Sequence, residues 1–175
     1  DEKKLSGDWQ AIKGNFGGGG GVQDLSGIST YREIDDILND SDVDLIDICL
    51  PTGMHYDVTM RALAAGKHVL LEKPIALKLD EADEMVAAAK AVGKQLMVAQ
   101  VLRYFPEFAF LKDAVDDERY GRFLGLHMKR VISKPLWGSG DWFKKYEETG
   151  AAGIDLHIHD TDFIQYLLGM PDRVH

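Results

Sequence analysis

Apolar segments alternate with amphipathic segments between residues 30 and 100, and this alternation constrains the fold more than any other feature of the chain. Short apolar runs predict strands at 43–50, 68–71 and 96–100. Helical spacing of apolar residues predicts helices at 31–39, 55–65 and 80–92, the last two ended by Gly66 and Gly93. Strands that alternate with helices of this length form βαβ units, so the sequence predicts an α/β protein with a parallel sheet and covering helices.

Polar residues stand where each predicted strand ends. Pro51 and Thr52 follow the first strand, Glu72 and Lys73 follow the second, and Gln100 closes the third. Right-handed crossovers bring the carboxyl ends of parallel strands to one edge, where ligands bind in open α/β sheets. A lysine that is partly desolvated there can act as an acid or a base. A surface ion pair before a turn proline is the alternative, and this stretch alone leaves both open.

The pattern changes after Arg103. It predicts a helix at 107–118, a strand with alternating polar and apolar residues at 123–133, a loop at 139–150 and a helix at 151–169. We therefore assign residues 1–120 to one α/β domain and residues 121–175 to the start of a second domain. The glycine run 17–21 has no strand before it and no helix after it, which favours a flexible loop over a phosphate loop.

The charge and the single cysteine narrow the classes of function. A formal net charge of -9 disfavours general binding to nucleic acid or to anionic membranes. No run approaches the roughly 20 apolar residues that span a bilayer, and no signal peptide is visible, so we expect a cytoplasmic protein without membrane partners. Cys49 can form no internal disulfide, and its apolar neighbours predict a small buried side chain rather than a reactive thiol.

The predicted helix 151–169 is apolar on most sides but carries a narrow polar stripe. At about 100° per residue, Asp155, His159, Asp162 and Tyr166 fall within roughly 60° of one another. A helix that is apolar on most sides is buried. The stripe should therefore face an interior or a cleft, which is where pKa values shift.

Three interpretations of this stripe remain open. Asp155 and His159 could form a structural i,i+4 pair. A metal site would also use such residues, but His157 and His159 diverge by about 160° on a helix and cannot bind one ion together, so no metal is predicted. In the third interpretation His159 carries a proton, and Asp155 orients it or acts as a second carboxylate.

Four segments give the chain a resemblance to a known family. They are 50–55 (LPTGMH), 65–74 (AGKHVLLEKP), 155–159 (DLHIH) and 166–169 (YLLG). In order and spacing they resemble the Gfo/Idh/MocA family of nicotinamide-dependent sugar and polyol oxidoreductases. The resemblance implies a Rossmann-like domain and a second α/β domain with an open sheet. It also implies NAD or NADP as cofactor, a sugar or polyol substrate, and a homo-oligomer assembled through the second domain.

The resemblance also implies roles for single residues. Lys73 resembles the active-site lysine of the family, and Asp155 and His159 resemble its catalytic aspartate and histidine. The positions that resemble cofactor-lining residues are Pro51, Thr52, His55, Glu72, Lys73, Gln100, Arg103 and Trp142, the last three falling where family members meet nicotinamide or substrate. A cis bond between Lys73 and Pro74 is implied as well.

The chain departs from the family pattern at both ends. The family opens with a strand and a glycine-rich dinucleotide loop that this sequence lacks, and the second domain is short. We expect a fragment of a longer enzyme that by itself binds the dinucleotide weakly or not at all. Where the family has three glycines, this chain has Ala151, Ala152 and Gly153.

Hydride transfer is the leading hypothesis for function. His159 would take the proton of a substrate hydroxyl, while Lys73 and Asp155 would orient that hydroxyl and stabilise developing charge. Three alternatives are a relative that cleaves glycosides without net redox chemistry, a non-catalytic dinucleotide-binding protein, and a metal-dependent hydrolase.

Overall fold

A computed structural model describes residues 2–10, 20–131 and 149–174 of the chain. Its elements follow one another in the order α1 (Glu2–Leu5), α2 (Ile34–Leu38), β1 (Leu45–Ile48), η1 (Thr52–Met54), α3 (His55–Ala64), β2 (His68–Leu71), α4 (Leu79–Val92), β3 (Leu96–Val98), η2 (Val101–Tyr104), α5 (Pro106–Asp116), the π-helical turn η4 (Ala152–Leu156) and α7 (Ile158–Leu168).

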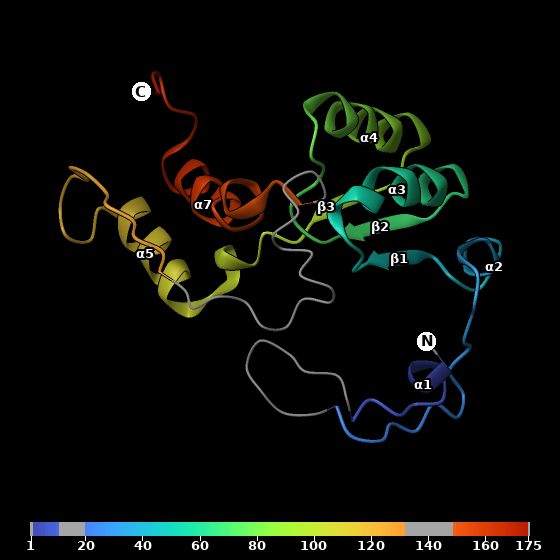
Figure 1. The fold of residues 1–175 in the computed structure, drawn as a ribbon. Coiled ribbons are helices and arrows are strands. Elements are labelled where there is room, and N and C mark those ends of the chain that lie inside the picture. Colours follow the sequence, from blue (N-terminus) through green and yellow to red (C-terminus); the bar gives the residue numbers. More distant parts are fainter. Residues whose placement is uncertain (1, 11–19, 132–148, 175) are drawn as a thin grey trace.

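The three strands form one parallel sheet in the order β1-β2-β3. Leu45 pairs with His68, and Val69 pairs with Leu96, so the strands run in step from one end of the sheet to the other. Helices α3 and α4 connect successive strands and pack side by side on the same face (Figure 1). The predicted parallel α/β sheet is therefore confirmed.

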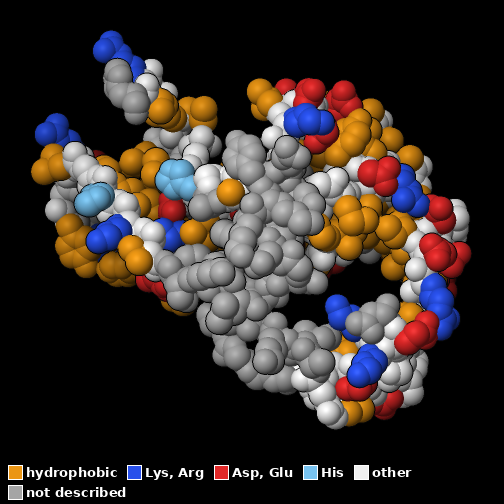
Figure 2. All heavy atoms as spheres, in the orientation of Figure 1, with side chains coloured by type: hydrophobic (Ala, Val, Ile, Leu, Met, Phe, Trp, Pro, Cys, Tyr) orange, Lys and Arg blue, Asp and Glu red, His pale blue; other side chains and the backbone are white. Residues whose placement is uncertain are grey.

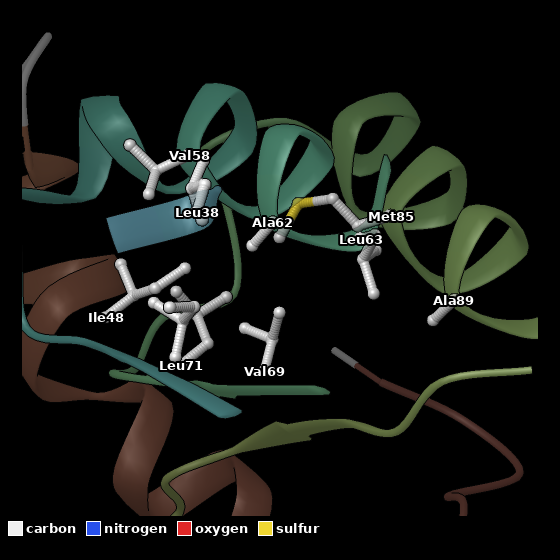
Figure 3. Close-up of a cluster of buried hydrophobic side chains, with 10 residues drawn as sticks. Leu38, Ile48, Val58, Ala62, Leu63, Val69, Leu71, Met85 and Ala89 are labelled. Carbon is white, nitrogen blue, oxygen red and sulfur yellow. The ribbon is translucent and has the colours of Figure 1, made fainter. Parts of the chain in front are cut away.

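The largest apolar core lies between this sheet and its two helices (Figure 3). Ile48, Val69 and Leu71 point into it from the strands, and all three are at most 2% exposed. Met85 from α4 is fully buried against them. α4 is an alanine-rich helix with acidic residues in its first turn, and it ends at Gly93, whose φ of 66° suits a residue without a side chain.

The opposite face of the sheet is less covered, and this corrects one prediction. On β1 the burial alternates, with Ile46 and Ile48 buried but Leu45 and Asp47 exposed. Cys49 continues the exposed series and is itself exposed, so the prediction of a small buried side chain is wrong. Partial desolvation of the sulfur and the nearby carboxylate of Asp47 nevertheless raise the pKa of the Cys49 thiol. It is therefore a poor nucleophile at neutral pH.

A second, smaller apolar cluster joins α5, η2 and α7, which lie together in Figure 1. Phe163 of α7 is fully buried, and the ring of Phe108 of α5 meets it edge to face with centroids 4.7 Å apart. The other buried residues of this cluster are Leu102 of η2 and Leu167 of α7. This cluster holds α7 close to the chain that leaves β3, and so places the polar stripe of α7 beside the strand ends.

Two predicted elements differ from the structure. The strand expected at 123–133 is absent over 123–131, where the backbone belongs to no ladder, because no neighbouring strand in the described residues offers hydrogen bonds to it. The single helix expected at 151–169 is divided into η4 and α7, with His157 between them. Across the described residues, no helix combines the length and the apolarity that a membrane crossing requires.

Candidate active site

The carboxyl ends of the three strands lie at one edge of the sheet, as the parallel order demands. Thr52 begins η1 directly after β1 and is 5% exposed, whereas Pro51 before it is exposed. Glu72 and Lys73 follow β2, and Gln100 lies between β3 and η2. All five of these predicted site residues therefore come from the same edge.

Lys73 is bound twice by Asp155, a residue 82 positions further along the chain. Its Nζ donates to the backbone oxygen of Asp155 at 2.6 Å and lies 3.0 Å from the carboxylate Oδ1. The two side chains are only 16% and 7% exposed. The peptide bond between Lys73 and Pro74 is cis, as the resemblance implied, and the carboxylate of Glu72 accepts a hydrogen bond from the Lys73 N–H at 3.2 Å.

His159 lies in the first turn of α7, close to this pair. Burial lowers the pKa of its imidazole below the ordinary value of 6.5, and the positive charges of Lys73 and Arg130 lower it further, against the opposing effect of Asp155. The ring is therefore uncharged at neutral pH and able to accept a proton. Its Nδ1 is buried and has no hydrogen-bond partner among the described residues. Lys73, Asp155 and His159 are called the lysine site below.

A buried ion pair next to the lysine site escaped the sequence analysis. Asp160 is 5% exposed and receives hydrogen bonds from Nε and Nη2 of Arg130 at 2.7–3.1 Å. The guanidinium holds the pKa of the Asp160 carboxyl below its ordinary value. No sequence signal joined these residues, because Arg130 lies in the segment for which a solvent-facing strand was expected. The pair places charges of both signs near His159, and Arg130 lowers its pKa while Asp160 raises it.

The polar stripe of the last helix does not act as one unit. Asp155 pairs with Lys73, so the structural pair of Asp155 with His159 is not the contact that forms. Asp162 receives the guanidinium of Arg103, with Nε 2.9 Å from Oδ2, and the same guanidinium lies 4.8 Å from the ring centre of Tyr166. The π-helical turn separates Asp155 from the regular α-helix and frees it to face β2.

A cleft of about 380 Å³ opens at the carboxyl end of β3. Its walls come from the segment after Lys73, from β3 and η2, and from α7: Ile75, Met97, Val98, Gln100, Arg103, Tyr104 and Asp162. The amide oxygen of Gln100 is buried without a hydrogen-bond partner among the described residues. Gln100 and Arg103 thus share one cleft, and two of its other lining residues, Ile75 and Asp162, lie two and three residues along the chain from Lys73 and His159.

The other predicted site residues have different positions. His55 is 1% exposed, with both ring nitrogens on backbone carbonyl oxygens. Trp142 lies outside the described residues, as do residues 17–19 of the glycine run. Within the described ranges, no group of three or more histidine, cysteine or carboxylate side chains could hold a metal ion.

Comparison with known proteins places the chain in a family. A model of an oxidoreductase family with an NAD-binding Rossmann fold matches residues 20–100, and a model of the GFO/IDH/MocA C-terminal domain matches residues 108–175. The chain belongs to the Gfo/Idh/MocA oxidoreductase family. The family resemblance that the sequence shows at the strand ends and in the last helix is therefore confirmed.

Individual relatives agree with this assignment. The chain is 31% identical over 139 residues to 1,5-anhydro-D-fructose reductase of Ensifer adhaerens, covering 79% of this chain and 42% of the relative. It is 29% identical over 143 residues to 2,7-anhydro-N-acetylneuraminate hydratase of Mediterraneibacter gnavus, covering 81% and 38%. A crystal structure of a protein from Sinorhizobium meliloti 1021, provisionally named a myo-inositol dehydrogenase, matches with a TM-score of 0.67 and 31% identity, covering 80% of this chain and 41% of that chain. The chain thus spans less than half the length of the relatives that it matches.

Proposed function

We propose that the whole protein transfers hydride between NAD or NADP and a hydroxyl-bearing carbon of a sugar, polyol or related substrate. The observation that carries this proposal is the lysine site, in which a buried Lys73–Asp155 pair lies beside an uncharged His159. A proton acceptor next to a fixed positive charge is what the oxidation of an alcohol requires.

The residues at the strand ends fit a nicotinamide cofactor. The buried oxygen of Gln100 lacks a donor and could accept one from a ligand amide, and the cleft beside it is open to a ligand. Pro51, Thr52, Glu72, Gln100 and Arg103 would hold the cofactor, as the carboxyl edge of a parallel sheet does in this fold. When bound, the dinucleotide supplies the acceptor for the hydride.

The chain's own residues then manage the proton and the charge. The imidazole of His159 accepts the proton of the substrate hydroxyl. Lys73 uses two N–H groups on Asp155, and no other acceptor among the described residues takes its third N–H, which we propose donates to the substrate oxygen. That donation stabilises the negative charge that develops on the oxygen as the proton leaves. Asp155 fixes the direction in which Nζ points.

Steady-state kinetics of the whole protein test this proposal. A panel of sugars and polyols is assayed with NAD and with NADP, following the formation of reduced nicotinamide. His159→Ala should lower kcat by about 10²–10⁴-fold, because the proton acceptor is gone. His127→Ala, which removes an exposed histidine, is the control. Unchanged turnover in His159→Ala would remove this residue from the mechanism.

A second candidate is a reaction without net redox chemistry, and one comparison favours it, because the relative from Mediterraneibacter gnavus is named a hydratase. The two candidates differ in the fate of the cofactor. Net oxidation produces one reduced nicotinamide for each substrate consumed, whereas the alternative leaves the cofactor unchanged at the end of each turnover. Measuring both quantities in one reaction separates them.

We further propose a cytoplasmic homo-oligomer whose contacts lie in the second domain. Large apolar side chains are exposed at the start of that domain, with Leu124 at 84% and Val131 at 77%. Apolar patches of this kind are typical of protein–protein contacts. Light scattering of the whole protein after gel filtration measures the assembly, and cell fractionation measures the location.

A further inference from the structure

The imidazole of His55 links two of the three strand ends. His55 is the first residue of α3 and is 1% exposed. Its Nε2 lies 2.9 Å from the backbone oxygen of Leu50, just after β1. Its Nδ1 lies 2.8 Å from the backbone oxygen of Pro74, the residue that follows Lys73. One buried ring therefore touches the backbone at both places.

We infer that His55 is a positioning residue for Lys73, an inference that rests on the proposed function. A carbonyl oxygen only accepts hydrogen bonds, and a neutral imidazole has one N–H to donate. The inference places that proton on Nδ1, which then donates to Pro74, while Nε2 is in contact with Leu50 without donating to it. The bond to Pro74 fixes the backbone from which the Lys73 side chain reaches Asp155. Both ring nitrogens of His55 face backbone oxygens and the ring is shielded from solvent, so His55 acts through the backbone rather than on the reacting atoms.

The polar character of His55 indicates more than space filling. An apolar side chain could occupy the same volume between α3 and the sheet. It would leave the carbonyl oxygen of Pro74 without this donor, and buried carbonyl groups are seldom left unpaired. The bond to Pro74 matters most for Lys73, since a shift of about 1 Å in a reacting group can lower the rate about 10²-fold.

Two substitutions separate the contact of the ring with Pro74 from its contact with Leu50. In His55→Asn the side-chain amide nitrogen takes the place of Nδ1 and can still reach Pro74. In His55→Gln the amide nitrogen takes the place of Nε2 and can still reach Leu50. We expect His55→Gln to lower kcat of the whole protein by about 10²-fold and His55→Asn to lower it clearly less. Equal losses in the two variants, or the reverse order, would overturn the inference.

A double substitution separates positioning from general stability. In the Lys73→Ala background, His55→Gln should lower the residual kcat no further, because the residue through which it acts is gone. An additional loss equal to that in the wild-type background would show a merely structural role. His68→Gln is the control, since His68 lies at the other end of β2 and accepts a hydrogen bond from the Gln95 N–H at 3.1 Å. Its kcat should stay within about twofold of wild type, as is usual for substitutions far from the chemistry.

The protonation of His55 can also be measured directly in the wild-type protein. This measurement requires neither an activity assay nor a folded variant. Long-range ¹H–¹⁵N spectra of the imidazole rings report which nitrogen of each histidine is protonated. A protonated Nδ1 in His55 supports the inference, and an unprotonated Nδ1 overturns it. If no substrate is turned over with either cofactor, the proposed function fails, whereas this spectrum still decides whether His55 holds Pro74.

Discussion

On β2, Val69 and Leu71 are buried among apolar side chains, whereas two residues later the half-buried Lys73 is paired with the buried carboxylate of Asp155. The first environment extends through the layer formed by α3, α4 and the sheet, where removal of apolar surface from water stabilises the fold. The second depends on charges brought from distant parts of the chain, and a buried ion pair contributes little net stability. The core thus stabilises the protein, while the lysine site specifies its chemistry.

Figure 2 shows a related contrast at the surface. Basic and acidic side chains are interleaved over the helical layer, and the coloured atoms on this face form no extended basic patch. Exposed pairs such as Lys78 with Glu81 are screened by water, unlike the Lys73–Asp155 pair. A charged pair is therefore weakened by water at the surface of the helical layer but is shielded from water at the lysine site.

The largest expected effect separates activity from stability. The double substitution Lys73→Met and Asp155→Leu removes the whole buried ion pair and replaces it with apolar side chains of similar size. We expect kcat to fall by at least about 10²–10³-fold, because the donor to the substrate oxygen is lost. The free energy of unfolding should stay unchanged or rise by about 1–4 kcal/mol, as in other replaced buried pairs. Steady-state kinetics and urea unfolding of the whole protein provide the two measurements.

Lys73→Met alone is the informative comparison for that experiment. It leaves the Asp155 carboxylate buried without its partner, so it should destabilise the protein more than the double substitution does. If the double variant is the less stable of the two, the ion pair contributes to the fold, and the contrast between core and site fails.

Met85→Ala should lower the stability of the protein while changing kcat little, the opposite of the double substitution. Met85 is fully buried in the core between α4 and the sheet and is not a residue of the lysine site. Its truncation should lower the free energy of unfolding by about 2–5 kcal/mol, through lost apolar contacts and the cavity that remains. Chemical denaturation measures this loss. A large fall in kcat at a temperature where the variant is still folded would show that the core also sets the geometry of the site.

His159 should control how kcat/KM depends on pH, and its neighbour Asp160 should control how stability depends on pH. The pKa of His159 is lowered from 6.5, so the imidazole loses its proton at a pH below 6.5. As pH rises, kcat/KM should therefore increase through that lowered pKa and then stay constant at higher pH. The pKa of Asp160 is lowered from 3.8 by Arg130, so its stabilising effect is complete above pH 3.8 and is lost as pH falls through the lowered value.

Two pH titrations measure these effects. The rate profile of the whole protein gives the apparent pKa of the proton acceptor, and a midpoint above 6.5 would contradict the assignment to a desolvated His159. Thermal unfolding of wild type and Asp160→Asn gives the stability profile. The difference between the two proteins should shrink as the solution becomes more acidic than pH 3.8.

The smallest expected effect concerns an exposed charge. Lys78 is 68% exposed in its ion pair with Glu81 at the start of α4. Lys78→Ala should change neither Tm nor kcat measurably, because water screens the pair. A clear fall in Tm would mean that surface charges contribute more to this fold than the contrast with the buried site allows.

Some parts of the site were predictable because they depend on local pattern. The strand at 68–71 and the helix that ends at Gly93 follow from apolar spacing and a glycine. Once the sheet was predicted to be parallel, Lys73 had to lie at its carboxyl edge. Local pattern failed for Cys49, because the apolar run around it did not reveal that one face of β1 is uncovered.

Other parts depend on residues that are far apart in the chain. Arg130 meets Asp160 and Lys73 meets Asp155 only after the chain folds, and sequence periodicity carries no information about such pairs. The strand expected at 123–131 failed for a similar reason, since a strand needs a partner and the described residues provide none.

By itself the sequence determined a parallel α/β layer, the edge at which its polar residues gather, and the family to which the chain belongs. Only the tertiary structure decided that Asp155 binds Lys73 rather than His159, that His159 is uncharged at neutral pH, and that His55 is buried between two carbonyl groups. Secondary structure follows from spacing along the chain, which the sequence displays directly. The state of a titratable group follows from burial and from charges brought in by distant segments, and these exist only in the folded protein.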